Sequence, residues 1–351
     1  MTPVLSTNRF RITASLLLAA FVAAAPAFAD HPEGQLPNVD DQGVFNIQLE
    51  NDLWGGGSDR HYTHGTRISY LTKENPTGFE ETVKNKINEW LPDLILPHAN
   101  RIGFVLGQSI FTPENIAATE LQERDRPYAG WMYGGVSLIS KWEEGGDYFD
   151  NLEINIGVVG PSALGEDTQT FVHRLKEVQL PNGWDNQLND ELGFVLFFER
   201  KWRFDSKASF LGLSADFTPN LGMALGNVYT YGAAGGIIRL GIDLPNDYGP
   251  PGIKPGLSGS DFFEPSKNFG WYVFSGIEGR VVGRNIFLDG NTFEDSHSVD
   301  KKFLVGDLQV GIVITLWESM RLAYTNVFRS REFDGQEGLD QFGSLHFSVR
   351  W

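Results

Sequence analysis

The sequence predicts an all-β protein, a closed antiparallel transmembrane β-barrel of 12 strands. Apolar and polar residues alternate with period two along most of the chain after residue 43, the pattern of strands with one apolar and one polar face. No run after residue 29 approaches the roughly 18 apolar residues of a membrane-spanning helix. The chain is also rich in aromatic residues and contains 40 glycines. A single large barrel can accommodate the roughly 320 residues of the mature chain as one domain.

The polar face of the predicted strands favours a barrel lumen over the core of a soluble sandwich, although both folds produce the same alternation. In the long strands near the C-terminus the polar face carries charged side chains, as expected of a water-filled lumen. These residues are Glu278, Arg280, Arg284, Arg321 and Arg329. The apolar face of the last strand ends at Trp351, which resembles the C-terminal assembly signal of bacterial outer-membrane barrels.

An even number of strands is expected for a closed single-chain barrel. The 12 predicted strands span residues 43–52, 63–72, 100–110, 129–143, 148–160, 191–204, 209–218, 228–242, 271–287, 304–317, 320–331 and 341–351. With the N-terminus in the periplasm, short links near residues 145–146, 205–206 and 318–319 face the periplasm. The outer loops are then residues 53–62, 111–128, 161–190, 219–227, 288–303 and 332–340.

Two long connections, residues 73–99 and 243–270, fall on the periplasmic side and depart from the short-turn pattern. The first contains a capping box, Thr77-x-x-Glu80, followed by apolar residues at helical spacing that begin at Phe79. We expect an amphipathic helix that lies at the membrane interface or, alternatively, covers the barrel end as a plug or lid. The second connection is rich in proline and glycine and is interpreted as a loop without chemistry of its own.

The first 29 residues have the features of a secretory signal peptide. Arg9 and Arg11 precede an apolar segment at residues 16–25, and Ala27-Phe28-Ala29 is a cleavage site of the small-x-small type. A transmembrane anchor is the alternative, but this apolar segment is too short to span a bilayer. The predicted organisation is therefore a signal peptide at 1–29 and an outer-membrane barrel at 30–351.

Charge and cysteine content exclude several classes of function. The predicted signal contains two of the 28 basic residues and none of the 45 acidic ones, so the mature chain carries a net charge of about −19. Such a charge argues against nucleic acid as a partner and permits divalent cations. Because the chain has no cysteine, disulfides, thiol chemistry and zinc bound by cysteine are excluded.

Polar residues gather at the mouth of the first predicted hairpin. Asn51 and Asp52 follow an alternating strand, and after a glycine-rich loop the next strand begins with Thr63 and Gly65. Strand parity places Asn51 on the lipid face and Asp52 on the lumen face. The strand must therefore end or bulge at Asn51, or the site must straddle the barrel rim.

A short helix is predicted in the outer loop 161–190. Glu166 and Asp167 begin a run that contains neither glycine nor proline and suit the positive end of a helix dipole. Gln169 and His173 are one helical turn apart and share one face. A second, apolar face consists of Phe171, Leu175 and Val178. An amide and an imidazole would thus lie side by side.

These residue types fit hydrolysis by water more closely than hydrolysis by a protein nucleophile. The chain has no G-x-S-x-G elbow, no H-E-x-x-H motif and no cysteine. The remaining design is a histidine base with a bound cation and backbone N–H groups at the oxyanion. His173, Asn51 with Asp52, and Gly65 could supply it. By spacing alone, however, a loop histidine is usually a surface residue and Asn-Asp is usually a turn.

Several motifs together resemble the lipid A 3'-O-deacylase family of Gram-negative outer-membrane barrels. They are Leu49-Glu50-Asn51-Asp52, Asp59-Arg60-x-Tyr62-Thr63-x-Gly65, Asp125-Arg126-Pro127-Tyr128-Ala129-Gly130-Trp131, Gly157-Val158-Val159-Gly160-Pro161 and Gln169-x-x-x-His173-Arg174. Their order and spacing match across nearly the whole mature chain. The resemblance implies a 12-stranded barrel with an outward-facing site between the wall and a loop helix. It also implies calcium-dependent hydrolysis of the 3'-linked acyloxyacyl ester.

The resemblance assigns roles to individual residues. His173 matches the catalytic base, with Asn51, Asp52 and Thr63 as the polar set around it. Asp52 is the expected ligand for Ca²⁺, and Gln169 matches an amide one turn from the base. Gly65 lies where an oxyanion donor or a close backbone approach is expected. Arg126 is either a contact for a lipid A phosphate or part of a structural ion pair. The basic residues of the family's second outer loop are not reproduced at 112–124, which contains Arg124 against three glutamates.

The resulting hypothesis is an esterase of the outer membrane that acts on lipid A or lipopolysaccharide, is a monomer, and faces the outer leaflet and cell exterior. One alternative is a phospholipase built on the same barrel. The other is a barrel without enzymatic activity, such as a porin.

Overall fold

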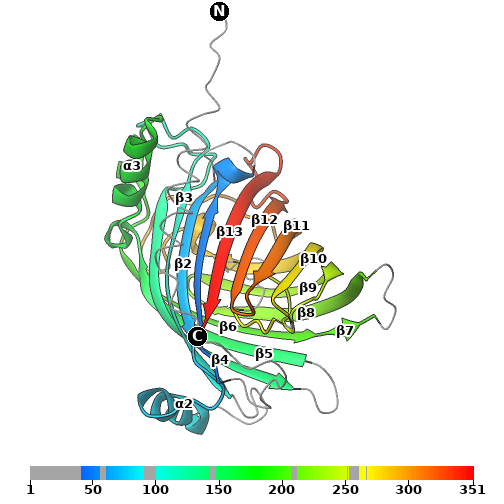
Figure 1. The fold of residues 1–351 in the computed structure, drawn as a ribbon. Coiled ribbons are helices and arrows are strands. Elements are labelled where there is room, and N and C mark those ends of the chain that lie inside the picture. The colour runs from blue at the N-terminus through cyan, green and yellow to red at the C-terminus, as the bar shows by residue number, and fades with distance from the viewer. Residues whose placement is uncertain are drawn as a thin grey trace, which may run out of the picture. The chain divides into compact units, whose positions relative to one another are not determined.

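The computed structural model describes residues 41–55, 61–90, 100–142, 148–206, 212–250, 252, 261–265 and 267–351. The predicted signal peptide lies outside these residues. The unit Asp40–Arg350 is a β-barrel, shown in Figure 1. Its strands are β1 (Val44–Asn51), β2 (His61–Leu71), β3 (Arg101–Thr112), β4 (Ala129–Trp142), β5 (Tyr148–Val159), β6 (Glu191–Trp202), β7 (Phe204–Asp205), β8 (Ser214–Gly226), β9 (Tyr229–Ile242), β10 (Phe269–Asn285), β11 (Leu304–Leu316), β12 (Met320–Arg329) and β13 (Asp340–Arg350).

Strands that are adjacent in the sheet pair in antiparallel ladders, and β1 pairs with β13. The pairing of β6 with β8 closes the sheet. Strand β7 is only two residues long and continues the line of β6 beside β8. The predicted closed barrel of 12 strands is therefore confirmed, with β7 as one extra short strand.

One predicted strand is wrong in its bounds. The expected strand 209–218 is β8, which runs on through Gly226, so the expected outer loop 219–227 is mostly strand. In the structure β8 pairs with β6 from Asn220 onward and with β7 at Phe217 and Asp216. Pro219 lies at the interruption between these two ladders and pairs with Gly236 of β9 on its other side.

The two faces of the wall are distinguished by burial. In β1, Asn46, Gln48 and Glu50 are buried and point into the lumen. On the outer face, Leu106 of β3 is 59% exposed and Ile156 of β5 is 54% exposed. Apolar side chains therefore face outward at the middle of the wall, as a membrane-spanning barrel requires.

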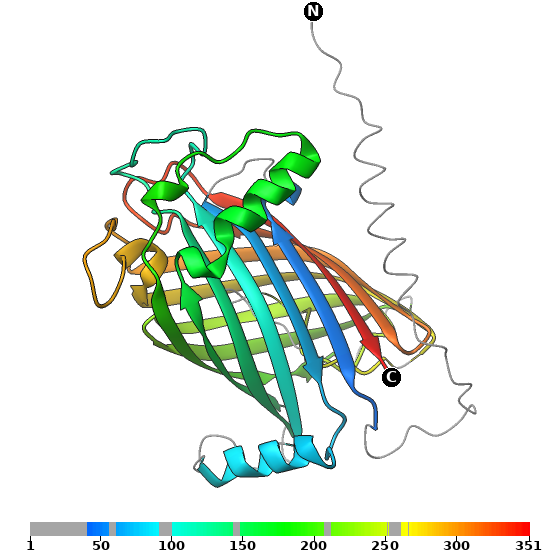
Figure 2. The ribbon, with the colours of Figure 1, turned by 90° about the vertical axis from the view of Figure 1, so that its left-hand side faces the viewer.

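The helices lie at opposite ends of this barrel. They are α2 (Phe79–Trp90), α3 (Gly165–Lys176) and α4 (Ile286–Asp289), with short 3₁₀ turns η1 (Asp52–Trp54), η2 (Pro161–Ala163) and η3 (Trp184–Asn186). Figure 2 shows α3 against the outside of the wall at one end and α2 at the other. Both predicted loop helices are confirmed. None of the helices in the described ranges is long and apolar enough to cross a membrane.

The lumen at the α2 end is filled by the connection between β9 and β10. Tyr248, Phe262 and Phe263 are buried against lumen-facing residues such as Ile139 and Phe149. Residues 243–250 and 261–265 belong to the expected loop, and this segment also carries a buried charge that the sequence did not indicate. Asp247 is fully buried between Arg239 and Arg321, and its Oδ2 lies 2.8 Å from Arg321 Nη1.

Aromatic side chains fill the lumen at the α3 end. The rings of Phe111 and Phe287 stack with centroids 4.0 Å apart, and Tyr229 packs against Phe287 at 5.5 Å. These residues belong to one buried cluster that also includes Tyr62 and Phe342. Both ends of the lumen are thus occupied by side chains of the described residues.

Candidate active site on the outer wall

Strand β1 ends at Asn51, and the chain turns at once into η1. The turn requires glycine on the neighbouring strand, because a Cβ at Gly343 would lie 2.7 Å from Trp54 Cβ. Tyr324 Oη donates a hydrogen bond to the carbonyl oxygen of Trp54 at 2.9 Å. The conflict in strand parity between Asn51 and Asp52 is therefore resolved, since the strand ends between them. The carboxylate of Asp52 is buried in this turn.

A β-bulge in β2 places Thr63 beside this strand end. Tyr62 pairs with Phe111 and His64 with Ile110, so Thr63 is the extra residue. Asn51 Nδ2 donates to the Thr63 carbonyl oxygen at 2.8 Å. The Thr63 Oγ1 atom lies 2.7 Å from Thr112 Oγ1, so the two hydroxyl groups are hydrogen-bonded. Asn51 and Thr63 are thus brought together as the sequence predicted.

His64 extends this polar group along the outer face. It pairs with Asn51 across the ladder, and its Nε2 lies 2.7 Å from Thr66 Oγ1. Lys176, in the last turn of α3, acts electrostatically on the His64 ring. The end of the loop helix therefore lies near the β1–β2 hairpin.

Glycine allows the loop helix to lie directly on the barrel wall. A Cβ at Gly130 of β4 would lie 2.9 Å from Ala163 Cβ and 3.2 Å from Gly165 N. The chain reaches this position through Gly160, whose φ of +105° favours glycine and whose N–H donates to the Gly130 carbonyl oxygen at 3.0 Å. Gln108 Nε2 of β3 donates to the carbonyl oxygen of Ala163 at 2.7 Å.

The polar stripe of α3 is its buried stripe. Gly165, Gln169 and His173, spaced by four residues, are the buried positions of the helix. The apolar stripe points the other way, with Phe171 62% exposed and Leu175 70% exposed. An ordinary surface helix of a soluble protein has the reverse arrangement. The orientation suits a helix whose exposed side meets lipid and whose polar side closes a site against the wall.

The His173 ring is held in one tautomer by the backbone. Its Nδ1 lies 2.5 Å from the carbonyl oxygen of Gln179, just beyond the end of α3. A carbonyl oxygen can only accept, so Nδ1 must carry the proton. In the neutral ring the basic lone pair is then on Nε2, which is the state that a general base requires.

The Gln169 amide is oriented by a tryptophan. Trp184 Nε1 of η3 donates to Gln169 Oε1 at 2.9 Å, and the indole is buried against Gly165 and Tyr128. This contact fixes the amide so that its Nε2 is the remaining donor group. Nε2 is buried and makes no hydrogen bond within the described residues.

Two predicted residues lie away from this outer-face group. Gly65 is inside the ladder, opposite Glu50 on one side and Ser109 on the other. Both backbone polar groups of such a residue point toward a neighbouring strand. Arg126 is buried on the lumen side, over the ring of Phe111 at 5.2 Å. Its Nη2 lies 3.6 Å from a Glu332 carboxylate oxygen, which is the geometry of the structural ion-pair alternative.

A second polar cluster lies at the mouth, next to Arg126. His61 Nδ1 is 2.6 Å from Asp340 Oδ1, and its Nε2 is 3.5 Å from Asp125 Oδ1. The backbone N–H groups of Glu114 and Arg126 also donate to Asp125, at 2.8 and 2.7 Å. Burial opposes ionisation of Asp125, but the contact with His61 and these donors hold its pKa below the usual value. The cluster joins the loop 113–128 to the ends of β2 and β13.

The donor set at Asp52 suits a hard cation in ligand type. Calcium binds carboxylate, amide, hydroxyl, backbone carbonyl and water oxygens. Asp52 supplies a buried carboxylate, with the amide of Asn51 beside it in the chain. The described residues contain no group of three or more His, Cys, Asp or Glu side chains arranged around a metal ion. A cation at Asp52 would therefore depend on neutral oxygen ligands as well.

Several residues of the site have no signal in the sequence. Trp184 and Gln179 act through contacts with α3 that form only after the loop has folded. Thr112 is recognisable only through the β2 bulge, which changes the pairing by one residue. His64 is the exception, because it lies between Thr63 and Gly65 within a motif of the sequence.

The fold and the site define a class: an outer-membrane β-barrel with a polar, enzyme-like site on the outside of its wall. A family model described as "Outer membrane protein LpxR" matches residues 16–351, and the chain belongs to this family. This membership agrees with the motif resemblance and supports the coarser function of an outer-membrane lipid A deacylase.

Solved structures agree with the fold. LpxR from Salmonella typhimurium has a TM-score of 0.69 and 22% identity, with 87% of this chain and 99% of that chain covered. The β domain of the Bordetella autotransporter BrkA follows at a TM-score of 0.42 and 12% identity, with 89% and 99% covered. No curated protein matches the chain.

Proposed function

We propose that this protein hydrolyses the 3'-linked acyloxyacyl ester of lipid A, with His173 as the general base. The observation that carries the proposal is the orientation of α3. Its His173 and Gln169 face the outer wall, whereas its apolar side chains are exposed. A site on the outer wall receives a substrate from the membrane, and the exposed apolar stripe would border the same lipid.

The His173 ring would take a proton from water on Nε2 while Nδ1–H remains bonded to the Gln179 carbonyl oxygen. The hydroxide oxygen bonds to the ester carbonyl carbon and gives a tetrahedral oxyanion. The Gln169 Nε2 group is the donor that the structure offers to this oxyanion. The bond from carbon to the 3' oxygen then breaks, and the imidazolium returns its proton to that oxygen. The products are a free acyloxyacyl acid and a 3'-hydroxyl group.

Asn51 and Thr63 would orient the wall side of the site. Asn51 ties the end of β1 to the β2 bulge, and Thr63 is fixed by Thr112. A Ca²⁺ ion held near Asp52, when bound, would supply Lewis-acid polarisation of the ester carbonyl. We do not assign a substrate contact to Gly65 or Arg126, because neither lies on the outer face with the other residues.

In this proposal the α3 end faces the cell exterior and the outer leaflet, where lipid A is located, and a single chain contains the whole site. The occupied ends of the lumen argue against the alternative of an open channel. At the α2 end, Tyr248 and Phe263 are buried within it. At the α3 end, the lumen contains the stacked rings of Phe111 and Phe287.

Mass spectrometry of lipid A tests the proposal. Cells that express the wild-type protein should lose the 3' acyl chains, whereas His173→Ala should leave lipid A intact in a folded, heat-modifiable barrel. Arg174→Ala is the matched control, because Arg174 is the next residue of α3 and is exposed. Loss of acyl chains with His173→Ala would remove His173 from the mechanism. Full activity in EDTA would remove the cation. Release of fatty acid from glycerophospholipid alone would identify a phospholipase instead.

A further inference from the structure

Helix α2 lies on the outside of the barrel wall and not across its lumen. Val83 and Ile87 pack against a cluster formed by Ile102, Leu138 and Leu152. These three residues form one row across β3, β4 and β5, since Ile102 pairs with Leu138 and Leu138 with Leu152. The row belongs to the outward, apolar face of the wall.

The outward face of the wall is buried where α2 covers it and exposed further along the same strands. Ile102 is fully buried, yet Leu106, four residues along the same face of β3, is 59% exposed. Leu152 is likewise buried, whereas Ile156 on the same face of β5 is 54% exposed. The helix therefore covers the last outward row of the wall, and the uncovered rows beyond it continue the same apolar surface.

The apolar stripe of α2 extends past the wall that it covers. Phe79 lies one turn before Val83 on the same helical face, and its side chain is 74% exposed. The opposite face carries Glu81 and Glu89, both exposed. An amphipathic helix with this division rests at a boundary between an apolar medium and water.

The connection between β2 and α2 holds the helix beside this end of the wall. Asn75 N–H donates to the Asn100 carbonyl oxygen at 2.9 Å, and Asn100 Nδ2 donates to Glu74 Oε1 at 2.6 Å. The chain then turns through Gly78, at φ +72°, directly into α2. The lumen at this end contains Tyr248, Phe262 and Phe263, whereas α2 packs against the outside of the wall, so the helix does not act as a lid.

We propose that α2 is a membrane-interface helix that inserts Phe79 among the phospholipids of the leaflet at the α2 end. With α3 facing the exterior, this is the inner leaflet. The occupant of the exposed stripe is phospholipid, because the stripe is continuous with the lipid-facing wall. The helix would fix the depth of the barrel at this end independently of any hydrolysis at the other.

The absence of cysteine from the chain allows a direct test. Single-cysteine variants Phe79→Cys, Glu81→Cys and Leu106→Cys are labelled with a nitroxide and reconstituted in phosphatidylethanolamine–phosphatidylglycerol vesicles. Collision rates with oxygen, which concentrates in acyl chains, and with a water-soluble nickel chelate are measured by power saturation. Leu106→Cys reports the lipid-facing wall, and Glu81→Cys is the matched control on the opposite face of α2. Phe79 is already exposed, so its replacement removes little packing.

The Phe79→Cys label should collide with oxygen in preference to nickel, at a depth of about 5–10 Å below the headgroup boundary, while the Glu81→Cys label should collide with nickel. Equal nickel accessibility at both positions would overturn the proposal in favour of a helix in water. Protection of Phe79→Cys from both reagents would also overturn it, because protein and not lipid would then cover the stripe. Neither result depends on lipid A hydrolysis.

Discussion

The Nδ1 atom of His173 lies 2.5 Å from the carbonyl oxygen of Gln179, six residues further along the same loop. The carbonyl oxygen of Gln179 therefore fixes the orientation of the base in the proposed reaction, at the ring nitrogen that a carboxylate contacts in a Ser-His-Asp triad. The oxyanion formed in the reaction also needs stabilisation, and Gln169 Nε2 is the donor proposed for it. The orientation of Gln169 is therefore a critical part of the site.

Trp184→Phe should lower the rate of deacylation because it removes the indole N–H that holds Gln169 Oε1. A neutral hydrogen bond contributes about 1 kcal/mol, so a loss felt only in the transition state would lower kcat about fivefold with little change in KM. Steady-state hydrolysis of lipid A in detergent micelles measures both constants. Tyr128→Phe is the control, since Tyr128 packs against Trp184 but its hydroxyl bonds to Ile116. An unchanged kcat for Trp184→Phe would contradict the assigned role of Gln169.

Gly130→Ala should displace α3 from the wall, because the new Cβ would lie 2.9 Å from Ala163 Cβ. A displacement of about 1 Å at a catalytic group can reduce a rate on the order of 100-fold. Gly134→Ala changes the same face of the same strand, yet its Cβ would meet only Val105 O, at 3.9 Å. Both variants should form heat-modifiable barrels, and only Gly130→Ala should lose deacylation. Equal activity of the two variants would show that contact with Gly130 does not position the helix.

The barrel and the loop helix could be predicted from the sequence because each depends on local periodicity. Alternation with period two identified the strands, and the spacing of Gln169 and His173 placed them on one helical face. Strand parity also indicated that β1 could not continue regularly through Asn51 and Asp52, and β1 ends there.

Features set by contacts distant in the sequence could not be predicted. The β2 bulge at Thr63 is visible only in its register with β3. The extension of β8 through Gly226 could not be predicted, because the sequence does not show that this strand changes partner from β7 to β6 near Pro219. The proline-rich connection gave no sign that Asp247 meets Arg239 and Arg321 from two distant strands. In each case the deciding partner lies in another part of the chain.

Acid should loosen the mouth loop 113–128 through Asp125. The pKa of Asp125 in the folded protein lies below its usual value because His61 and two backbone N–H groups hold the carboxylate, against the effect of burial. By linkage, ionised Asp125 stabilises the folded loop fully above the unfolded pKa of about 3.9. This stability is lost as the pH falls through the lower pKa of Asp125 in the folded protein. Pepsin digestion between pH 4.5 and 2 should therefore cleave this loop increasingly in the wild type.

Asp125→Asn should show high cleavage already at pH 4.5 and a weaker dependence on pH. Asp185→Asn, at an exposed position of another loop, controls for the pH dependence of pepsin itself. The interpretation fails if the ratio of cleavage in Asp125→Asn to that in Asp185→Asn does not change across this range.

Asp247→Ala should destabilise the barrel strongly, since it leaves Arg239 and Arg321 buried without the carboxylate between them. Arg239 keeps Asp216, whose Oδ1 accepts from Nε at 2.8 Å, and Arg321 keeps the Ser348 hydroxyl at 3.3 Å from its Nε. Removal of one member of a buried ion pair costs about 3–5 kcal/mol.

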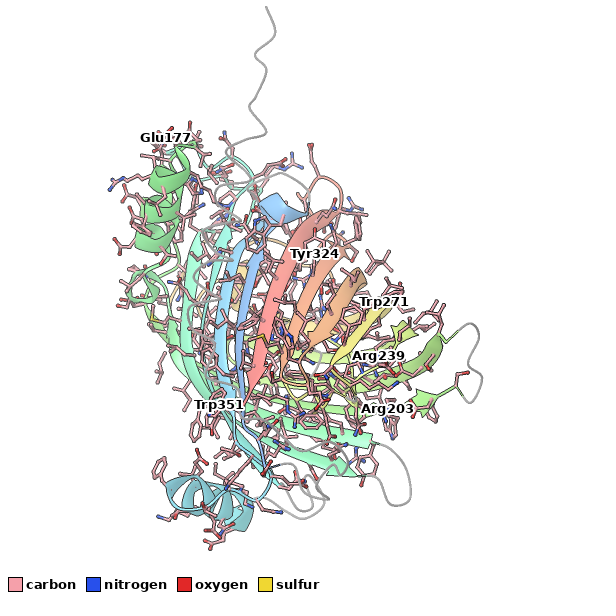
Figure 3. All side chains as sticks on the ribbon, viewed as in Figure 1. Glu177, Arg203, Arg239, Trp271, Tyr324 and Trp351 are labelled. Carbon is pink, nitrogen blue, oxygen red and sulfur yellow. The ribbon has the colours of Figure 1, made fainter. Side chains whose placement is uncertain are left out.

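Urea unfolding of the protein in liposomes measures this loss of stability. The folded fraction is read from the faster gel migration of unheated samples. Asp205→Ala removes an exposed carboxylate whose Oδ1 lies 3.2 Å from Arg203 Nε, and should cost at most about 1 kcal/mol. Figure 3 labels Arg203 and Arg239 on the same side of the barrel. Because the segment that carries Asp247 fills the lumen, its release should also permit ion conduction across a planar bilayer. A variant as stable and as non-conducting as Asp205→Ala would show that Asp247 does not anchor this segment.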